Sequence, residues 1–326
     1  MFKIITFTVI FIAFCSTAFG CLPKSDEYIW SNIKAKAEFP EGYNYPVFVL
    51  NDREMFAINK GGWLSTDGKN WTKTGLPESG LNSAYQKYVQ FNGAVYALGA
   101  LDGNYLGFKL STKILRTRDG KTWETVAEKS NLPHRIFYGA VAFKDKIWLV
   151  GGYDGERYYN DVWNSADGVR WTRAAEKTAW TPRTAGVFIF QDKIWLVGGG
   201  VIDGEKSDNP NSGNEVWTSA DGINWTPVEI DAPRMPGGTP VVFDGKLWMV
   251  GANRTNGDFG SAVFMSGDAL NWRELSAPWT PRGGTVVWVF GDELFMTGGK
   301  YSYTENGEIK FVYSNDVWAM RKAIKN

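Results

Sequence analysis

Residues 146–152 read Lys-Ile-Trp-Leu-Val-Gly-Gly, and residues 193–199 repeat the same seven residues. Weaker copies lie at residues 246–251 and 293–299. A short apolar run that ends at paired glycines is typical of a buried β-strand followed by a turn. Similarity at a fixed spacing indicates a repeat architecture, in which each unit buries its faces against its neighbours.

Two further elements recur with this strand. Asn-Asp-Val-Trp at residues 160–163 returns at 315–318, and as Asn-Glu-Val-Trp at 214–217. Ser-x-Asp-Gly-x-x-Trp begins at Ser65, Ser165 and Ser219, with close variants from Thr117 and Ser266. Its final tryptophans recur about every 50 residues, which is the period of a four-stranded propeller blade. These tryptophans are Trp71, Trp123, Trp171, Trp225 and Trp272.

Each unit is predicted to form four short strands, and six units can be counted. Their first strands are predicted to end at Leu50, Phe91, Phe143, Phe190, Phe243 and Phe290. The sixth unit lacks a fourth strand, and residues 28–37 are predicted to supply it, with Trp30 in the place of Trp71. This strand would close the ring and cover an open sheet edge. The sequence therefore predicts an all-β, six-bladed propeller of four-stranded antiparallel blades, as a single domain over residues 21–326.

The order of these elements resembles kelch repeats. Pro-Arg, a strand, Gly-Gly, Asn-Asp-Val-Trp and a final Trp-Thr follow one another most closely in residues 130–230, and the resemblance extends over residues 40–320. It implies a propeller of the galactose oxidase/kelch-like superfamily. The Ser-x-Asp-Gly-x-x-Trp turn looks instead like the Asp boxes of sialidase propellers, one residue shorter. Leu115 and Phe264 depart from the pattern, because each stands in the place of the third-strand tryptophan.

The N-terminus is predicted to be a signal peptide over residues 1–20. Lys3 precedes an apolar run, and Ala18-Phe19-Gly20 offers small residues at a cleavage site. Cleavage there would make Cys21 the first residue, and the second cysteine, Cys15, would be removed. Ala-Phe-Gly-Cys resembles a bacterial lipoprotein signal, in which that cysteine receives lipid. We expect an exported protein, either anchored in the membrane through Cys21 or released into the periplasm or medium.

Composition argues against several functions. The 35 basic and 35 acidic residues give no net charge, and no basic stripe appears, so nucleic-acid binding has no electrostatic support. His134 is the sole histidine, which excludes a site built from several imidazoles of one chain. No phosphate-binding glycine loop is evident. The sequence predicts no metal and no cofactor.

A ligand site is predicted on the face of the ring that carries the long connections after Gly-Gly. These connections cover residues 101–112, 153–159, 201–213, 253–260 and 300–313, and they share their face with the links between blades. Long, varied loops on a rigid scaffold are where binding residues usually lie. The candidate loop residues are Tyr153, Asp154, Arg157, Arg254 and Tyr301.

Four arginines lie in the links just before first strands, namely Arg135, Arg183, Arg234 and Arg282. If they pointed inward, they would form a partial cationic ring suited to a carboxylate or phosphate. Alternatively, they tie neighbouring blades together, as this arginine does in the kelch pattern. The recurring tryptophans, such as Trp148 and Trp195, are interpreted as packing between blades rather than as a platform for sugars.

Two functions remain open, and the first is favoured. The protein is a binding or protein-interaction module at the cell envelope, with a protein or glycan ligand on the long-loop face and no catalysis. Alternatively, it is a carbohydrate-active enzyme on an acidic sugar, similar to sialic-acid mutarotases or sialidases. The second function requires at least two of the four arginines to converge on a pocket with a carboxylate or a tyrosine. No catalytic residue can be assigned from the sequence.

Overall fold

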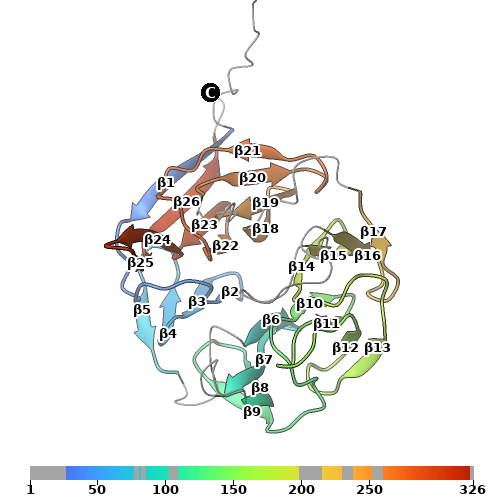
Figure 1. Cartoon of the computed structure of the whole chain (residues 1–326). Coiled ribbons are helices and arrows are strands. Elements are labelled where there is room, and N and C mark those ends of the chain that lie inside the picture. Colours follow the sequence, from blue (N-terminus) through green and yellow to red (C-terminus); the bar gives the residue numbers. More distant parts are fainter. Residues whose placement is uncertain are drawn as a thin grey trace, which may run out of the picture.

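The strands are arranged radially around a central axis (Figure 1). A computed structural model describes residues 27–76, 81, 86–102, 109–197, 215–229, 238–251 and 260–323. These residues form 26 strands. Within those ranges there is no helix, and thus none that could cross a membrane.

Six antiparallel sheets of four strands each make up the ring. Blade 1 contains β2 (Val47–Leu50), β3 (Glu54–Ile58), β4 (Gly62–Ser65) and β5 (Thr72–Thr74). Blade 2 contains β6 (Lys87–Phe91), β7 (Ala94–Asp102), β8 (Lys109–Thr117) and β9 (Trp123–Ala127). Blade 3 contains β10 (Gly139–Phe143), β11 (Lys146–Val150), β12 (Val162–Ser165) and β13 (Thr172–Ala175).

The second half of the ring repeats this order. Blade 4 contains β14 (Gly186–Phe190), β15 (Lys193–Val197), β16 (Val216–Ser219) and β17 (Thr226–Pro227). Blade 5 contains β18 (Thr239–Phe243), β19 (Lys246–Val250), β20 (Val263–Ser266) and β21 (Arg273–Leu275). Blade 6 contains β22 (Val286–Phe290), β23 (Glu293–Thr297), β26 (Val317–Lys322) and β1 (Tyr28–Lys34). All six predicted first-strand ends are the last residues of their strands.

Ring closure by the N-terminal strand is confirmed. β1 is the outermost strand of blade 6 and pairs antiparallel with β26, so that Trp30 lies opposite Met320 and Asn32 opposite Trp318. In blade 1, Trp63 lies opposite Lys73, just as Trp318 lies opposite Asn32 in blade 6. Trp71 comes two residues before Lys73, and Trp30 comes two residues before Asn32, so Trp30 takes the place of Trp71 as predicted. The Trp30 ring meets the ring of Trp279 edge-on, with 4.8 Å between centroids.

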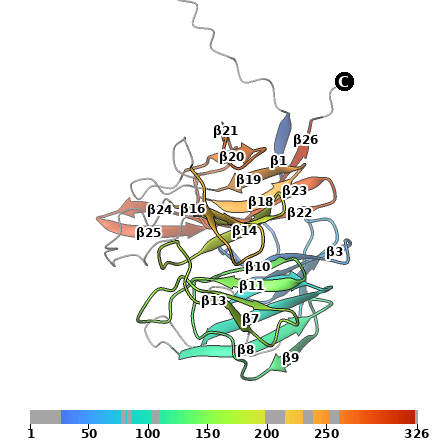
Figure 2. The same ribbon diagram turned by 90° about the vertical axis from the view of Figure 1, so that its right-hand side faces the viewer.

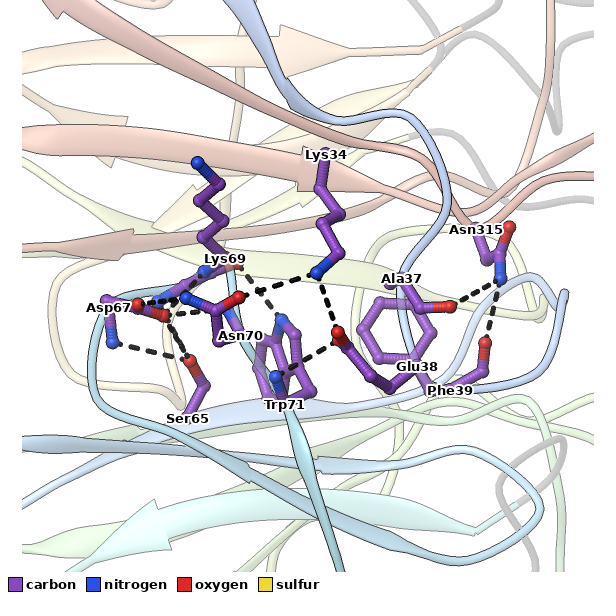
Figure 3. A network of polar contacts seen from close by, with 11 residues as sticks. Lys34, Ala37, Glu38, Phe39, Ser65, Asp67, Lys69, Asn70, Trp71 and Asn315 are labelled. Atoms are coloured by element: carbon purple, nitrogen blue, oxygen red, sulfur yellow. Dashed lines mark hydrogen bonds and ion pairs between the residues drawn. The ribbon is translucent and has the colours of Figure 1, made fainter.

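The segment that follows β1 is bonded to the blades on both sides of the closure (Figure 3). Glu38 accepts the backbone N–H of Trp71 in blade 1 at 3.1 Å and pairs with Lys34 at 2.6 Å. Asn315 of blade 6 donates to the carbonyls of Ala37 and Phe39 at 3.1 and 2.9 Å. Side chains from the two ends of the chain therefore hold the ring shut.

Apolar packing joins each blade to the next. Six buried clusters are present, one at each of the six boundaries between neighbouring blades. Trp148 is 3 % exposed between blades 3 and 4, and Trp195 is 5 % exposed between blades 4 and 5. The prediction that the recurring tryptophans pack between blades is confirmed at these positions, because a sheet face is covered only by its neighbour.

The two faces of the ring differ in their connections. Turns between first and second strands, and between third and fourth strands, lie on one face, which we call the short-turn face. Connections between second and third strands share the other face with the links between blades, and we call it the long-loop face. Chain reversal at each turn dictates this division, because every strand crosses from one face to the other.

Two of the predicted long loops are wrong in part, because both contain strand residues. β7 continues to Asp102 and β8 begins at Lys109, so residues 101–102 and 109–112 are strand, and residues 103–108 lie outside the described residues. Residues 300–313 form a hairpin of β24 (Lys300–Glu305) and β25 (Glu308–Tyr313). Its turn, Asn306-Gly307, has φ angles of 51° and 80°, the positive values that a two-residue hairpin turn needs.

Candidate functional site

In blades 3, 4 and 6, the arginine before the first strand binds the acid that precedes the third strand of the same blade. In blade 3, the guanidinium of Arg135 contacts both carboxylate oxygens of Asp161, at 2.5 and 3.2 Å. It also donates to the carbonyl of Gly151 at 3.1 Å. The indole N–H of Trp163 donates to the same carboxylate at 2.8 Å. Arg135 is 8 % exposed and Asp161 5 %, so the ion pair is buried.

Blades 4 and 6 repeat this arrangement. The Arg183 guanidinium, which is fully buried, binds Glu215, and Trp217 donates to the same carboxylate at 3.1 Å. Desolvation raises the pKa of Glu215, but hydrogen bonds from Thr181 and Trp217 and the charge of Arg183 outweigh it, so the pKa lies below its usual value. Burial lowers the pKa of Arg183, against the effect of Glu215.

In blade 6, Arg282 lies 2.5 Å from Asp316, and the indole N–H of Trp318 donates to that carboxylate at 2.8 Å. Pro-Arg and Asn-Asp-Val-Trp are therefore two halves of one contact within a blade. Each of the three described arginines binds an acid of its own blade, which favours a structural role within the blade over a cationic ring, and over the predicted tie between neighbouring blades. Arg234 lies outside the described residues.

A cavity of about 600 Å³ opens on the long-loop face where blade 2 meets blade 3. Four elements contribute to it: the start of β8, the link before β10, the loop between β11 and β12, and β12 itself. Its lining is Leu110, Pro133, His134, Arg135, Asp154, Glu156, Tyr159 and Trp163. Apolar and aromatic side chains therefore share one opening with two carboxylates, a guanidinium and an imidazole, and such polar groups can orient a ligand.

Tyr159 is the centre of this cavity's polar network. Its hydroxyl donates to Asp154 and accepts from Arg157 Nε at 2.9 Å. The guanidinium carbon of Arg135 lies 3.8 Å from its ring centroid, and that of Arg157 lies 4.9 Å away. Asp154 also accepts the backbone N–H groups of Glu156 and Arg157, both at 2.9 Å. The loop is thus held in shape by its own bonds before any ligand arrives.

The charge states of this network are fixed at neutral pH. Desolvation raises the pKa of Asp154, but the hydrogen bonds from Tyr159 and from two backbone N–H groups lower it by more than that, so the net shift is downward. Desolvation, and then the hydrogen bond to Asp154, raise the pKa of Tyr159. Asp154 is therefore an anion and Tyr159 a neutral phenol. Neither is tuned toward pH 7, where a general acid or base works best.

The structure brings four of the predicted site residues together. Arg135, Asp154 and Arg157 surround Tyr159, and Tyr153 supports the loop, with its hydroxyl donating to the Gly155 carbonyl at 2.7 Å. Of the remaining described candidates, Arg183 and Arg282 lie in the links before β14 and β22, and Tyr301 lies in β24. Arg254 and Cys21 lie outside the described residues.

Sequence reasoning did not select Tyr159, Trp163 or Glu156 as site residues. The available signal was the pair Tyr158-Tyr159 directly before Asn-Asp-Val-Trp, since aromatic residues next to a repeat motif in a long loop lie beside the scaffold. No group of three metal-ligating side chains occurs among the residues that the structure describes.

Comparison with known families supports the architecture. The family model of the DUF6242 beta propeller domain matches residues 15–323. The match includes β1 and β26, so the strand pair that closes the ring lies within it. A search of curated proteins finds no match to the chain. The kelch identity of the repeats stays a prediction.

Proposed function

Because the chain belongs to the family of DUF6242 beta propeller domains, we propose that it is a binding module without catalytic activity, exported and anchored at the cell envelope. Propeller domains commonly mediate interactions through the loops of one face. The cavity around Tyr159 is the ligand site. The observation that carries this proposal is the loop 153–159, whose hydrogen bonds preorganise an open cavity while the repeat arginines are already paired.

The lining favours a neutral, hydroxyl-rich glycan as the ligand of this cavity. Carboxylates such as Asp154 and Glu156 accept hydrogen bonds from sugar hydroxyls, and the half-buried ring of Trp163 offers a surface for stacking. The same carboxylates repel an acidic sugar. No feature of the described residues favours the alternative, an enzyme on acidic sugars, since the arginines it needs are bound to Asp161, Glu215 and Asp316.

Anchoring through Cys21 would orient the ring. The N-terminal end of β1 lies on the short-turn side, where Tyr28 donates to Asp244 of the β18–β19 turn at 2.6 Å. Seven residues from Cys21 to Tyr28 reach at most about 25 Å, at about 3.5 Å per residue. A lipid at Cys21 would therefore hold the short-turn face near the membrane and leave the long-loop face pointing away from it.

A glycan array tests the cavity. The chain carrying Cys21→Ser is expected to bind neutral oligosaccharides, and Tyr159→Phe, which removes both hydroxyl contacts, is expected to weaken binding about tenfold. Asp192→Asn, on the exposed short-turn side, is the matched control and is expected to bind as the parent does. Binding restricted to sialylated glycans, or turnover of one of them, would favour the enzyme instead.

Metabolic labelling with an alkyne fatty acid tests the anchor. The full chain expressed in a bacterial host is expected to take up the label and to fractionate with membranes. Cys21→Ser is expected to lose the label and to leave the membrane fraction, because the cysteine sulfur is the attachment point. Equal labelling of both chains would overturn the lipoprotein proposal and leave the glycan site unaffected.

A further inference from the structure

The hairpin β24–β25 does not belong to any of the six blades. It forms a two-stranded sheet with a continuous register from Lys300 opposite Tyr313 to Glu305 opposite Glu308. Figure 2 shows it projecting from one side of the ring, whereas β1 and β26 bring the chain ends to another. By topology this side is the long-loop face, because the hairpin connects the second and third strands of blade 6.

One face of the hairpin exposes a row of large apolar side chains. Alternate residues of a strand point to the same side, so Ile309, Phe311 and Tyr313 of β25 share a face. They are 67, 48 and 37 % exposed. Tyr43, 40 % exposed, extends the row, with its ring 5.7 Å from that of Tyr313. We call these four residues the aromatic stripe. Scattered exposed apolar residues are ordinary, but a contiguous patch marks an interaction site.

The backbone beside this stripe is open. With a two-residue turn, the pair Glu305–Glu308 is hydrogen-bonded, so the N–H and C=O groups of Ile309 and Phe311 point outward from β25. Lys300 at the start of β24 is already bonded to Gly283, at 2.8 and 2.9 Å. Among the described residues, no strand pairs with the outer edge of β25. An exposed strand edge with apolar side chains is a template for a further strand.

The charged residues near the aromatic stripe indicate what kind of partner could pair with the edge of β25. Lys300 Nζ lies 4.5 Å from the Tyr43 ring and 5.0 Å from the Phe311 ring, at the base of the stripe. Within the described part of the chain, no carboxylate forms an ion pair with it. The lysine is thus available for an acid on a partner. The hairpin tip carries Glu305 and Glu308, which oppose contact with anionic lipid headgroups.

We propose that β25 is a docking edge for a partner protein, which adds an extended strand with apolar side chains on the aromatic stripe and a carboxylate at Lys300. Backbone hydrogen bonds along Ile309 and Phe311 would supply affinity, and the alternating side chains would supply selectivity. This surface is separate from the cavity around Tyr159, so the two proposals stand or fall independently. The partner binds as a strand addition, and the cavity binds a glycan.

Synthetic peptides test this edge directly. The probe is fluorescein-labelled Glu-Thr-Val-Thr-Val-Thr-Val-Thr-Glu amide, which alternates apolar and polar residues and brings a carboxylate to Lys300 in either strand direction. Fluorescence polarisation is measured against the chain carrying Cys21→Ser. Binding is expected to weaken about tenfold with Phe311→Thr and about threefold with Lys300→Gln. A peptide with N-methylated valines is expected not to bind, because it lacks the pairing N–H groups.

Tyr303→Thr provides the matched control. Tyr303 is 47 % exposed on the same hairpin, but it lies opposite Lys310, on the other face. It is expected to bind the peptide as the parent does. Three outcomes would overturn the proposal. The first is no binding of the unmodified peptide at about 1 mM, the dissociation constant of a weak complex. The second is equal binding by the Phe311→Thr chain, and the third is a parent dimer in light scattering that Phe311→Thr converts to monomer, which would assign the edge to a second copy.

Discussion

The two faces of the ring satisfy their polar groups in different ways. On the short-turn face, each Ser-x-Asp turn is closed by its own side chains: Gly222 N–H donates to Ser219 at 2.8 Å, and Asp221 accepts two backbone N–H groups at 2.8 Å. Figure 3 includes the blade 1 copy, built from Ser65 and Asp67. On the long-loop face, residues 153–159 and 300–313 adopt unrelated structures. The repeated face is internally complete, whereas the varied face leaves groups for ligands.

The short turns also lock neighbouring blades together. The glycine of each turn between third and fourth strands that carries Asp-Gly lies against an aromatic ring of the preceding blade, with Gly222 over Trp148 and Gly168 over Tyr96. A Cβ at these positions would lie 2.4 and 2.5 Å from ring carbons. Repetition on this face therefore reflects packing between blades as well as turn chemistry, and a ligand site there would have to disrupt both.

The largest expected effect is a difference in stability between two variants on the long-loop face, one in a buried ion pair and one on an exposed loop. Arg135→Gln leaves the Asp161 carboxylate buried without its partner, and we expect the free energy of unfolding to fall by about 3–5 kcal/mol. Arg157→Gln, on the exposed loop of the same cavity, is expected to leave stability unchanged within error. Urea denaturation of both variants checks this. Similar losses in the two would mean that the arginine–acid pairs are not what anchors the loops.

The second effect tests the docking of the turns. Gly222→Ala places a methyl group 2.4 Å from the Trp148 ring at a φ of 79°, so overpacking and backbone strain add, and we expect a loss of about 3 kcal/mol. Gly291→Ala is the matched control on the same face, because its φ is 58° but its Cβ would meet open space. It is expected to cost about 1 kcal/mol. Equal costs would show that the turn glycine matters for its backbone angle alone.

Much of the fold could be predicted from the sequence because its signals are local. The first-strand ends, such as Phe143 and Phe190, and the place of Trp30 follow from residue spacing within one repeat. The hairpin β24–β25 was predicted as a loop, although Asn306-Gly307 between alternating aromatic residues was a hairpin signal. The number of residues between two blade strands does not by itself distinguish a loop from a hairpin.

The candidate site was harder to predict because its contacts are not local. Both halves of the Arg135–Asp161 pair were recognised as repeat motifs, but their 26-residue separation gave no sign that they bind each other. The role of Tyr159 depends on two arginines reaching its ring from different elements. Arg157 is close to Tyr159 in the sequence, but Arg135 comes from the link before β10 and reaches the ring only in the folded blade.

The pH dependence of stability is a third, smaller test of the closed turns. Desolvation raises the pKa of Asp221, but hydrogen bonds from Asn224 and the turn backbone bring it down to about 2. A folded-state pKa below the unfolded value contributes stability above about pH 4, and this contribution is lost as the pH falls toward 2. Urea denaturation from about pH 5 to about pH 2.5 gives the free energy of unfolding over this titration. It is expected to fall less steeply with decreasing pH in Asp221→Asn than in the parent. Identical slopes would contradict the prediction.

The smallest effect comes from the one described turn that departs from the Asp-Gly pattern. Ala269 holds the glycine place in blade 5 at a φ of 62° and is fully buried in the cluster with Trp195. Ala269→Gly would relieve about 1 kcal/mol of left-handed strain, but it removes a buried methyl worth about 0.8 kcal/mol and loosens the unfolded chain. We therefore expect a change within about 0.5 kcal/mol of zero in urea denaturation. A gain above 1 kcal/mol, about the whole strain energy, would mean that the Ala269 methyl contributes nothing to the contact between blades 4 and 5.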